Sequence, residues 1–269
     1  MKENKIIESI INIIPEDYSK NIKSIDVKVS SEGTRMLIFN LSRDQRLKFR
    51  KLIPLLEDGK NTSFYIKLDS RFHHIGGFTH VFDKVNEYNY NISPYSPLKT
   101  LKQSALYRTI RNSSPKGTTR NAIIINTHCG LIPVHLSKLY NRMYCVDVER
   151  NYTDEARLNL KINRINNCLF FSSNTNKWLK EFEGHKYTLP GRKHKIGLFV
   201  CDATLLSKES CDLLFNIEPE TVILFSEDKE AINNIGTLIE TKDNYEKTFE
   251  SLTEGFYIRK IKRKEGIGS

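Results

Sequence analysis

The sequence lacks the cysteine patterns that hold a metal ion or a cluster. Its five cysteines are irregularly spaced and no two of them form a C-x-x-C pair, so neither a zinc ribbon nor an iron–sulfur loop is supported. Several lie in apolar runs, as Cys201 does, where a reduced and buried thiol is the default. His73 and His74 have no nearby cysteine or spaced acid, and a strand pair with one histidine inward is the better interpretation. We therefore expect no metal site.

The sequence also lacks long hydrophobic runs. No apolar stretch approaches the roughly 20 residues that span a bilayer, and no secretory segment opens the chain. There is no internal repeat, and the tyrosines and phenylalanines are not paired as in an RNA-recognition pattern. These absences predict a soluble cytoplasmic protein with no membrane partner.

Positive charge is what the chain has in excess. Its 269 residues carry a formal net charge of +10, and 39% of them are hydrophobic, which is enough to build a core. A surplus of this size is typical of proteins that contact phosphate or an anionic surface. A solvated basic surface without such a partner is the alternative. The frequent Asn, Lys and Ile indicate an A/T-rich coding genome, and this bias inflates the lysine content.

The first part of the chain has the pattern of a small α+β domain. Apolar residues at helical spacing predict a helix that ends before Pro15, and the runs Ile25–Val29 and Met36–Phe39 predict a hairpin with one buried face. A further helix is expected over 44–56, and further strands over 63–68, 72–80 and 88–92. We place this domain at residues 1–92 and interpret it as an RNA-binding type of module.

From residue 93 onward, short apolar strands alternate with helices. Strands are predicted over 122–126, 143–148, 169–172, 196–202 and 221–226, and helices over 99–111, 134–140, 153–163, 176–182 and 208–216. This alternation predicts an α/β domain with a parallel sheet that helices cover on both faces. We assign it to residues 93–269, and we interpret its last residues as a mobile basic tail.

Open parallel sheets bind ligands beyond the carboxyl ends of their strands. The loop Asn126–Gly130 follows the first predicted strand, and Asp147 ends the second one about 20 residues later, where an acid can hold the ribose hydroxyls of a nucleoside cofactor. An aspartate at a strand end is more often a helix N-cap or a solvated loop residue. The surrounding residues are therefore needed to decide its role.

Those residues resemble motifs of the RNA uracil-5-methyltransferases, which make 5-methyluridine in tRNA and rRNA. In chain order, the first matches are Ile92–Pro94 with Ser96 to the family's I-S-P-N-S, Leu106–Tyr107 to the L-Y of its next helix, and Cys129–Gly130 to Y-C-G-x-G-T. The second motif block, V-E-I followed by A-x-x-N-A-x-x-N-x-x-x-N, matches Val146–Val148 with Ala156, Asn159, Asn163 and Asn167. Asp202 matches the start of D-P-P-R, and Phe225–Ser226 match the start of V-S-C-N-P. The resemblance covers roughly residues 20–230. It implies a Rossmann-like domain that binds S-adenosylmethionine (SAM), preceded by a smaller domain that helps to hold RNA.

The groups that would methylate uracil are replaced in this chain. The reaction needs a thiolate that adds to C6 of the base and a carboxylate that removes the C5 proton. Glu227 stands where the family has its nucleophilic cysteine, and a carboxylate is a poor nucleophile for this addition. The SAM loop is shortened, so that Ile132 or Pro133 would obstruct the approach of the backbone to the cofactor. D-P-P-R has become D-A-T-L, and no acid aligns with the family's general base.

These replacements predict a pseudoenzyme with no catalytic residue and no cofactor. Any remaining cofactor site would be vestigial and would consist of Gly130, Asp147 and Asp202. The retained property would be affinity for structured RNA, either rRNA or tRNA, and no DNA is expected. We interpret the protein as a factor that occupies a functional site of the ribosome and silences translation.

Three basic clusters are the candidate RNA contacts. They consist of Lys99, Lys102, Arg108 and Arg111 near helical spacing, of Arg192, Lys193 and Lys195 in a loop, and of Arg259, Lys260, Lys262, Arg263 and Lys264 in the tail. Ordinary surface charge is the alternative for each cluster, and it is equally good for the first one. For the tail, phosphate contact with release of counterions is favoured.

Two other functions stay open. The first is an active SAM-dependent tRNA or rRNA methyltransferase that modifies another target atom without a thiol. The second is a protein–protein scaffold that uses the fold without RNA. A generic nucleotide-binding fold in which this chemistry was never present is a further alternative, and it is less favoured because it would not explain the I-S-P segment or the gapless series of asparagines.

Overall fold

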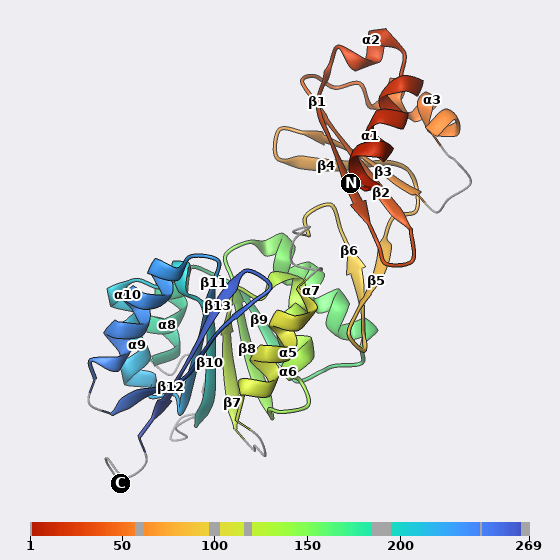
Figure 1. Cartoon of the computed structure of the whole chain (residues 1–269). Helices are drawn as coiled ribbons and strands as arrows, with labels where there is room; N and C mark the ends of the chain where they lie inside the picture. The colour runs from red at the N-terminus through yellow and green to blue at the C-terminus, as the bar shows by residue number, and fades with distance from the viewer. Residues whose placement is uncertain are drawn as a thin grey trace. The chain divides into compact units, whose positions relative to one another are not determined.

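The computed structural model describes residues 2–56, 62–96, 103–115, 120–183, 195–242 and 244–264. The chain forms two compact units, Met1–Leu98 and Lys99–Ser269. Each unit has its own sheet (Figure 1). No helix in the described ranges is long and apolar enough to cross a membrane.

The first unit is an α+β module. Its elements are α1 (Lys2–Ile13), α2 (Glu16–Ser19), β1 (Ile22–Val29), β2 (Arg35–Leu41), α3 (Arg46–Leu56), β3 (Thr62–Leu68), β4 (Arg71–Gly77), β5 (Val81–Val85) and β6 (Tyr88–Ile92). The four-stranded sheet has the order β1-β2-β3-β4, and β5 pairs with β6 in a separate hairpin. The predicted hairpin of β1 and β2 is confirmed, because these strands pair in antiparallel register.

The core of this unit lies between the sheet and two helices. Helix α3 is the crossover between the parallel strands β2 and β3, and it buries Phe49, Leu52, Ile53 and Leu56 at helical spacing. Phe49 packs against Phe39 with ring centroids 5.1 Å apart, and both side chains are fully buried. Burial of one such side chain stabilises the fold by about 1.5–3 kcal/mol.

The second unit contains a seven-stranded sheet with the order β12-β13-β11-β10-β7-β8-β9. Its strands are β7 (Asn121–Ile125), β8 (Arg142–Asp147), β9 (Cys168–Ser172), β10 (Ile196–Asp202), β11 (Thr221–Ser226), β12 (Tyr245–Thr253) and β13 (Phe256–Arg263). The five strands from β7 to β11 are parallel, whereas β13 runs antiparallel to both of its neighbours. The predicted parallel sheet is therefore confirmed and carries an antiparallel extension.

Helices cover both faces of this sheet (Figure 1). They are α5 (Ser104–Ser113), α6 (Leu131–Leu136) and α7 (Arg150–Ile162) on one face, and α8 (Thr175–Glu183), α9 (Lys208–Ile217) and α10 (Lys229–Glu240) on the other. Two short 3-10 turns, η1 (His128–Gly130) and η2 (Ala203–Leu205), follow β7 and β10. Strand β11 is buried along its whole length, as expected for a central strand between two helical layers.

The prediction of a mobile basic tail is wrong for residues 259–263, because these residues belong to β13. Ile258 and Ile261 on this strand are fully buried and anchor it in the sheet. Helix α10 and strand β12 precede it and were also not predicted. The charged side chains between the isoleucines concealed the strand, and Arg259 itself is buried, with only 6% of its surface exposed.

Candidate functional site

The order of the parallel strands reverses between β7 and β10. From β7 the chain proceeds outward through β8 to β9, and it then crosses to β10 and β11 on the other side. Ligands of such sheets bind beyond the carboxyl ends of the strands at this point. A cavity of about 340 Å³ lies there, lined by the ends of β7 and β8, the residues after β9, and Leu205 after β10. Its volume is within the usual range for small-molecule sites, about 300–1,000 Å³.

The loop after β7 has an unusual backbone. Asn126, Cys129 and Gly130 have positive φ angles of 63°, 59° and 86°. A Cβ atom on Gly130 would lie 3.1 Å from the Cα atom of Ala156 and 3.0 Å from a methyl carbon of Leu160. Glycine and alanine at these two positions therefore let the loop pack directly on α7. This packing is the physical reason for the C-G and A-x-x-N motifs.

The asparagines of the second motif hold the backbone together. The amide of Asn159 donates to the carbonyl oxygen of Cys129 at 2.9 Å, and that of Asn163 donates to the carbonyl oxygen of Asn159 at 2.8 Å. The amide of Asn167 donates to the carbonyl oxygens of Ser137 and Tyr140. Asn159 thus fixes the loop that borders the cavity, and none of the three asparagines is among the described residues that line it.

Asp147 is the predicted site residue that lines the cavity. It is 4% exposed, and its carboxylate accepts hydrogen bonds from the backbone N–H groups of Thr127 and Glu149, both at 3.1 Å. Burial raises the pKa of this carboxyl above its usual range, and the two N–H donors oppose that effect. A carboxylate offers about four acceptor positions, so Asp147 can still accept from a ligand hydroxyl. The N-cap of α7 is Glu149, so Asp147 is not the helix cap.

Several further residues of the cavity were missed at the level of sequence. Glu149 and Tyr152 follow β8, and Asn174 follows β9. The signal that would have found them is their position just after the carboxyl ends of predicted strands, where a ligand of this fold lies. Together with Asp147 and Asn126 they give the cavity two carboxylates, one aromatic ring and two amides.

Ile132 and Pro133 were expected to obstruct the cofactor loop. Both are buried within α6, and neither lines the cavity among the described residues. Gly130 turns the chain into α6 before these residues begin, since it is the left-handed N-cap of that helix. The predicted obstruction is therefore not found in this part of the chain.

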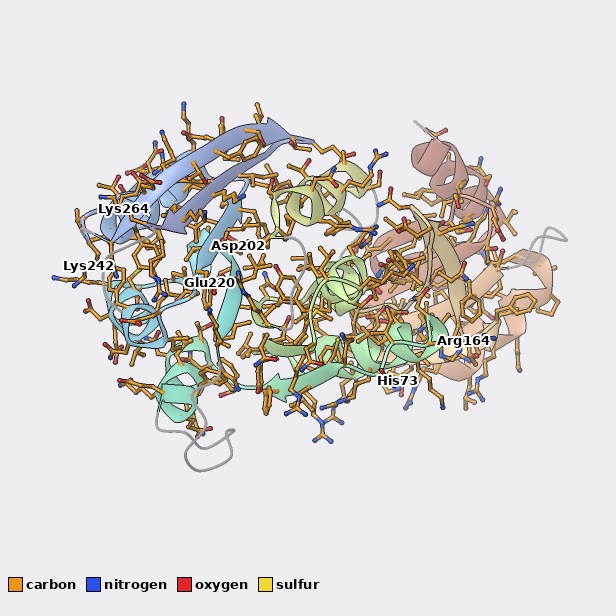
Figure 2. The ribbon with its side chains drawn as sticks, turned by 90° about the horizontal axis from the view of Figure 1, so that it is seen from below. His73, Arg164, Asp202, Glu220, Lys242 and Lys264 are labelled. Carbon is orange, nitrogen blue, oxygen red and sulfur yellow. The ribbon has the colours of Figure 1, made fainter. Side chains whose placement is uncertain are left out.

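Asp202 and Glu227 lie at the carboxyl ends of the neighbouring strands β10 and β11. The carboxylate of Asp202 (Figure 2) accepts from the backbone N–H and the hydroxyl of Thr204, at 3.0 and 2.8 Å. Burial raises the pKa of Asp202, and the negative charge of Glu227 adds to this effect. Glu227 is exposed. Neither acid is among the described residues that line the cavity.

No cysteine is among the described residues that line the cavity. Cys129, Cys145, Cys201 and Cys211 are buried. Burial raises the pKa of the Cys145 and Cys201 thiols, and it raises the pKa of Cys211 to about 11. Cys168 is half-buried on β9 at the outer edge of the sheet. The site thus offers a nucleoside-sized hollow without an accessible thiol.

Where the structure describes them, the predicted RNA contacts lie on different parts of the second unit. Lys99, Lys102, Arg192 and Lys193 lie outside the described residues. Arg108 is exposed and Arg111 is half-buried on α5. Lys195 precedes β10 and so lies at the amino end of the sheet, opposite the cavity.

Several of these cations are partly neutralised by acids. Lys195 pairs with Glu220 at 3.3 Å, and Arg263 pairs with Glu218 at 3.1 Å (Figure 2 labels Glu220). Arg259 is buried between Glu240 at 3.5 Å and Glu250 at 3.4 Å, so it is unsuited to phosphate contact.

The rest of the third cluster lies at the surface to different degrees. Lys260 and Lys262 are half-buried on β13, and Lys264 after the strand is exposed. Burial lowers the pKa of Lys260, and the neighbouring charge of Lys262 adds to this effect. Of this cluster, Lys264 therefore has the least hindered charge.

With this geometry known, comparison with known proteins gives one significant sequence match. Over 117 residues the chain is 24% identical to the zebrafish (Danio rerio) tRNA (uracil-5-)-methyltransferase homolog B. The match covers 43% of this chain and 24% of that protein. No family model matches the sequence.

Solved structures show the fold. The structure of Pyrococcus abyssi tRNA (uracil-54, C5)-methyltransferase with S-adenosyl-L-homocysteine matches with a TM-score of 0.69 at 12% identity, over 96% of this chain and 65% of that chain. The complex of aTrm5 with tRNALeu matches with a TM-score of 0.54 at 15% identity, over 96% and 78%. The protein has the Rossmann-like fold of SAM-dependent methyltransferases. That part of the prediction is confirmed.

Proposed function

We propose that this protein binds structured RNA by means of a methyltransferase fold and does not make 5-methyluridine. The observation that carries the proposal is the absence of an accessible thiol at the cavity within the described part of the chain. Uracil C5 attacks a methyl donor only after a nucleophile has added to C6. The exposed carboxylate of Glu227 does not supply such a nucleophile.

The RNA partner is supported by charge and by likeness. The net charge is +10, and the structures with a similar fold include tRNA methyltransferases, one of them in complex with tRNA. We propose rRNA or tRNA as the ligand, the cytoplasm as the location and the ribosome as the assembly that carries the RNA. Binding to phosphates releases counterions, so the affinity should fall steeply as salt rises.

The test is an affinity measurement with tRNA and with purified ribosomes between 50 and 300 mM KCl. We expect the dissociation constant to rise at least tenfold over this range. Cosedimentation through a sucrose gradient, with and without nuclease, then identifies the assembly. An affinity that does not change with salt, or no binding at low salt, would contradict the proposal and favour the scaffold function.

A second candidate function is supported by the cavity. Its volume, the buried carboxylate of Asp147 and the aromatic ring of Tyr152 fit a nucleoside such as SAM. When bound, SAM would supply an electrophilic methyl group. Asp147 would accept hydrogen bonds from its ribose hydroxyls, and Tyr152 would offer an apolar surface. The target would then be an atom that is nucleophilic without thiol addition.

Calorimetry with SAM and with S-adenosylhomocysteine separates the two candidates, with Asp147→Asn as the site variant and Asp154→Asn, an exposed aspartate on α7, as the control. Micromolar binding that only Asp147→Asn abolishes would favour the enzyme. Radiolabelled SAM and tRNA or ribosomes then report methyl transfer. Label found on C5 of uracil would overturn the proposal made above.

A further inference from the structure

The sheet of the second unit ends at β9, and a groove of about 650 Å³ runs along this edge. Its walls are the second half of α7, the turn after it, and β9. None of its described lining residues also lines the cavity at the carboxyl ends of the strands. We call this feature the β9 groove, and it is a second concave surface of the same unit.

One wall of the β9 groove is basic. Arg157, Lys161 and Arg164 line it, and their spacing of four and three residues places them on one side of the helix and its end. All three are exposed (Figure 2 labels Arg164). Arg157 pairs with Asp154 at 2.8 Å, whereas Lys161 and Arg164 have no carboxylate partner in the described part of the chain. No acid is among the described residues that line the groove.

The other wall is apolar and partly exposed. Phe170 is half-buried on β9, and its neighbour Leu169, on the opposite face of this edge strand, has 42% of its surface exposed. The guanidinium of Arg157 lies 5.8 Å from the ring centroid of Phe170. The next residue, Phe171, packs on Trp178 beneath the other face of the sheet, so Phe170 faces α7 and the groove.

We propose that the β9 groove binds a single-stranded segment of RNA, with phosphates along the three cations and a base against Phe170. Arg157 and Lys161 are about 6 Å apart along α7 at 1.5 Å per helical residue, which is close to the two steps of about 3.4 Å between three consecutive phosphates of one strand. Arg164 follows the end of the helix and lines the same groove. A basic wall facing an aromatic side chain is the arrangement that holds unpaired bases and their backbone. The inference rests on the proposed function and adds where the RNA binds.

An acidic peptide that adds a strand to β9 is the competing occupant, and the backbone disfavours it. The carbonyl of Asn167 accepts from Met143 and the N–H of Ser173 donates to Asp147, so odd-numbered residues bond to β8. The backbone N–H and C=O groups of the even-numbered residues therefore point away from β8, towards the open edge of the sheet. The outward carbonyl of Phe170 already accepts from the guanidinium of Arg157 at 3.2 Å. An added strand would have to displace that bond.

The test measures fluorescence anisotropy with a labelled 12-nucleotide single-stranded RNA of mixed sequence. The groove variant is Arg157→Gln, Lys161→Gln and Arg164→Gln in one chain. The matched control is Lys177→Gln, Lys208→Gln and Lys242→Gln, which removes the same charge from exposed positions near the helices of the opposite face. We expect the groove variant to bind at least tenfold more weakly, with a salt slope smaller by about 2. The control should stay within about threefold of the wild type.

A second variant, Phe170→Leu, keeps the charge and removes the ring, and we expect it to weaken binding by about tenfold. Thermal melting confirms that each variant folds. An equal loss of RNA affinity in the groove and control variants, or no loss in the groove variant, would overturn the inference about the groove. RNA binding by the wild type would still uphold the proposed function in that case. No RNA binding by the wild type would overturn both. Binding of a labelled poly-glutamate peptide that the groove variant loses, with RNA binding unchanged, would assign the groove to a peptide.

Discussion

The side-chain amide of Asn159 donates to the carbonyl oxygen of Cys129 at 2.9 Å, and this bond ties α7 to the loop after β7. Asn159 is 1% exposed and Cys129 is 3% exposed, so water cannot replace either partner. The bond lies beside the cavity and fixes the loop that carries Thr127, whose N–H group donates to Asp147. A motif that resembles one of a catalytic family thus has a structural role in this chain.

Replacement of Asn159 by alanine should lower the free energy of unfolding by about 1–3 kcal/mol, because the Cys129 carbonyl remains buried without its donor. Urea denaturation followed by circular dichroism measures the change. Asn166→Ala is the matched control, since Asn166 is exposed in the turn after α7, and its effect should stay below about 0.5 kcal/mol. Equal effects of the two variants would show that the bond to Cys129 adds nothing.

Gly130→Ala should destabilise the second unit by about 1–3 kcal/mol, because the added methyl group meets α7 and the positive φ disfavours an L side chain. Gly255→Ala separates these causes. Gly255 has a φ of 84°, close to the 86° of Gly130, but a Cβ atom there meets nothing within 4 Å. We therefore expect a smaller loss, about 1 kcal/mol. If both variants lose the same stability in urea, packing on α7 has no part in the choice of glycine.

Arg259→Met should destabilise the fold by about 1–3 kcal/mol without a specific loss of RNA affinity. The side chain joins β13 to β12 and α10 through Glu250, Glu240 and Asn233. Its removal takes the guanidinium from Glu240 and Asn233, whereas Glu250 keeps its pair with Lys247. Gly236 on α10 leaves the space that the guanidinium fills. Lys264→Met, at an exposed position, is the control for stability. A folded Arg259→Met protein with RNA affinity reduced far more than in Lys264→Met would contradict this assignment.

The five parallel strands could be predicted because each is an apolar run between polar loops, as in Ile196–Asp202. The last two strands could not. In Tyr245–Thr253 most side chains are exposed, and an edge strand of this kind carries charges that guard it from pairing with other chains. In Phe256–Arg263 the buried residues are separated by cations whose partners lie far away in sequence. Periodicity shows a buried face, but it does not show an ion pair that another element completes.

The site was predictable to a similar degree. Asp147 could be found because its place at a strand end is local. Glu149, Tyr152 and Asn174 also follow strand ends, but which of the residues after a strand line the cavity depends on how the segments after β8 and β9 pack against each other. The expected role of Ile132 and Pro133 failed for the same reason. Ile132 and Pro133 follow the loop after β7 closely in sequence, but Gly130 turns the chain into α6, and both side chains are buried there.

The carboxyl group of Asp44 should titrate far below its ordinary range. Hydrogen bonds from the side chain and backbone of Arg46 lower the pKa of Asp44 from 3.8 to about 2. The stabilisation from this depressed pKa is therefore complete above about pH 4 and is lost as the pH falls through about 2. Arg46→Met should move the Asp44 pKa back towards 3.8, as carbon-detected NMR titration would show. The control is Arg43→Met, which leaves the Asp44–Arg46 contacts in place, and a pKa unchanged by Arg46→Met would refute the assignment.

The thiols provide the sharpest check on the absence of uracil methylation. In the native protein we expect Cys168 alone to react rapidly with Ellman's reagent, because the other four cysteines are buried. Since burial raises the pKa of Cys211 to about 11, a change from pH 7 to pH 9 should leave its reaction slow. Cys168→Ser should remove the fast phase, and denaturant should restore four reacting thiols. Rapid labelling of Cys129 or Cys201, slowed by SAM, would place a thiol at the cavity and reopen conjugate addition to uracil as the reaction of this protein.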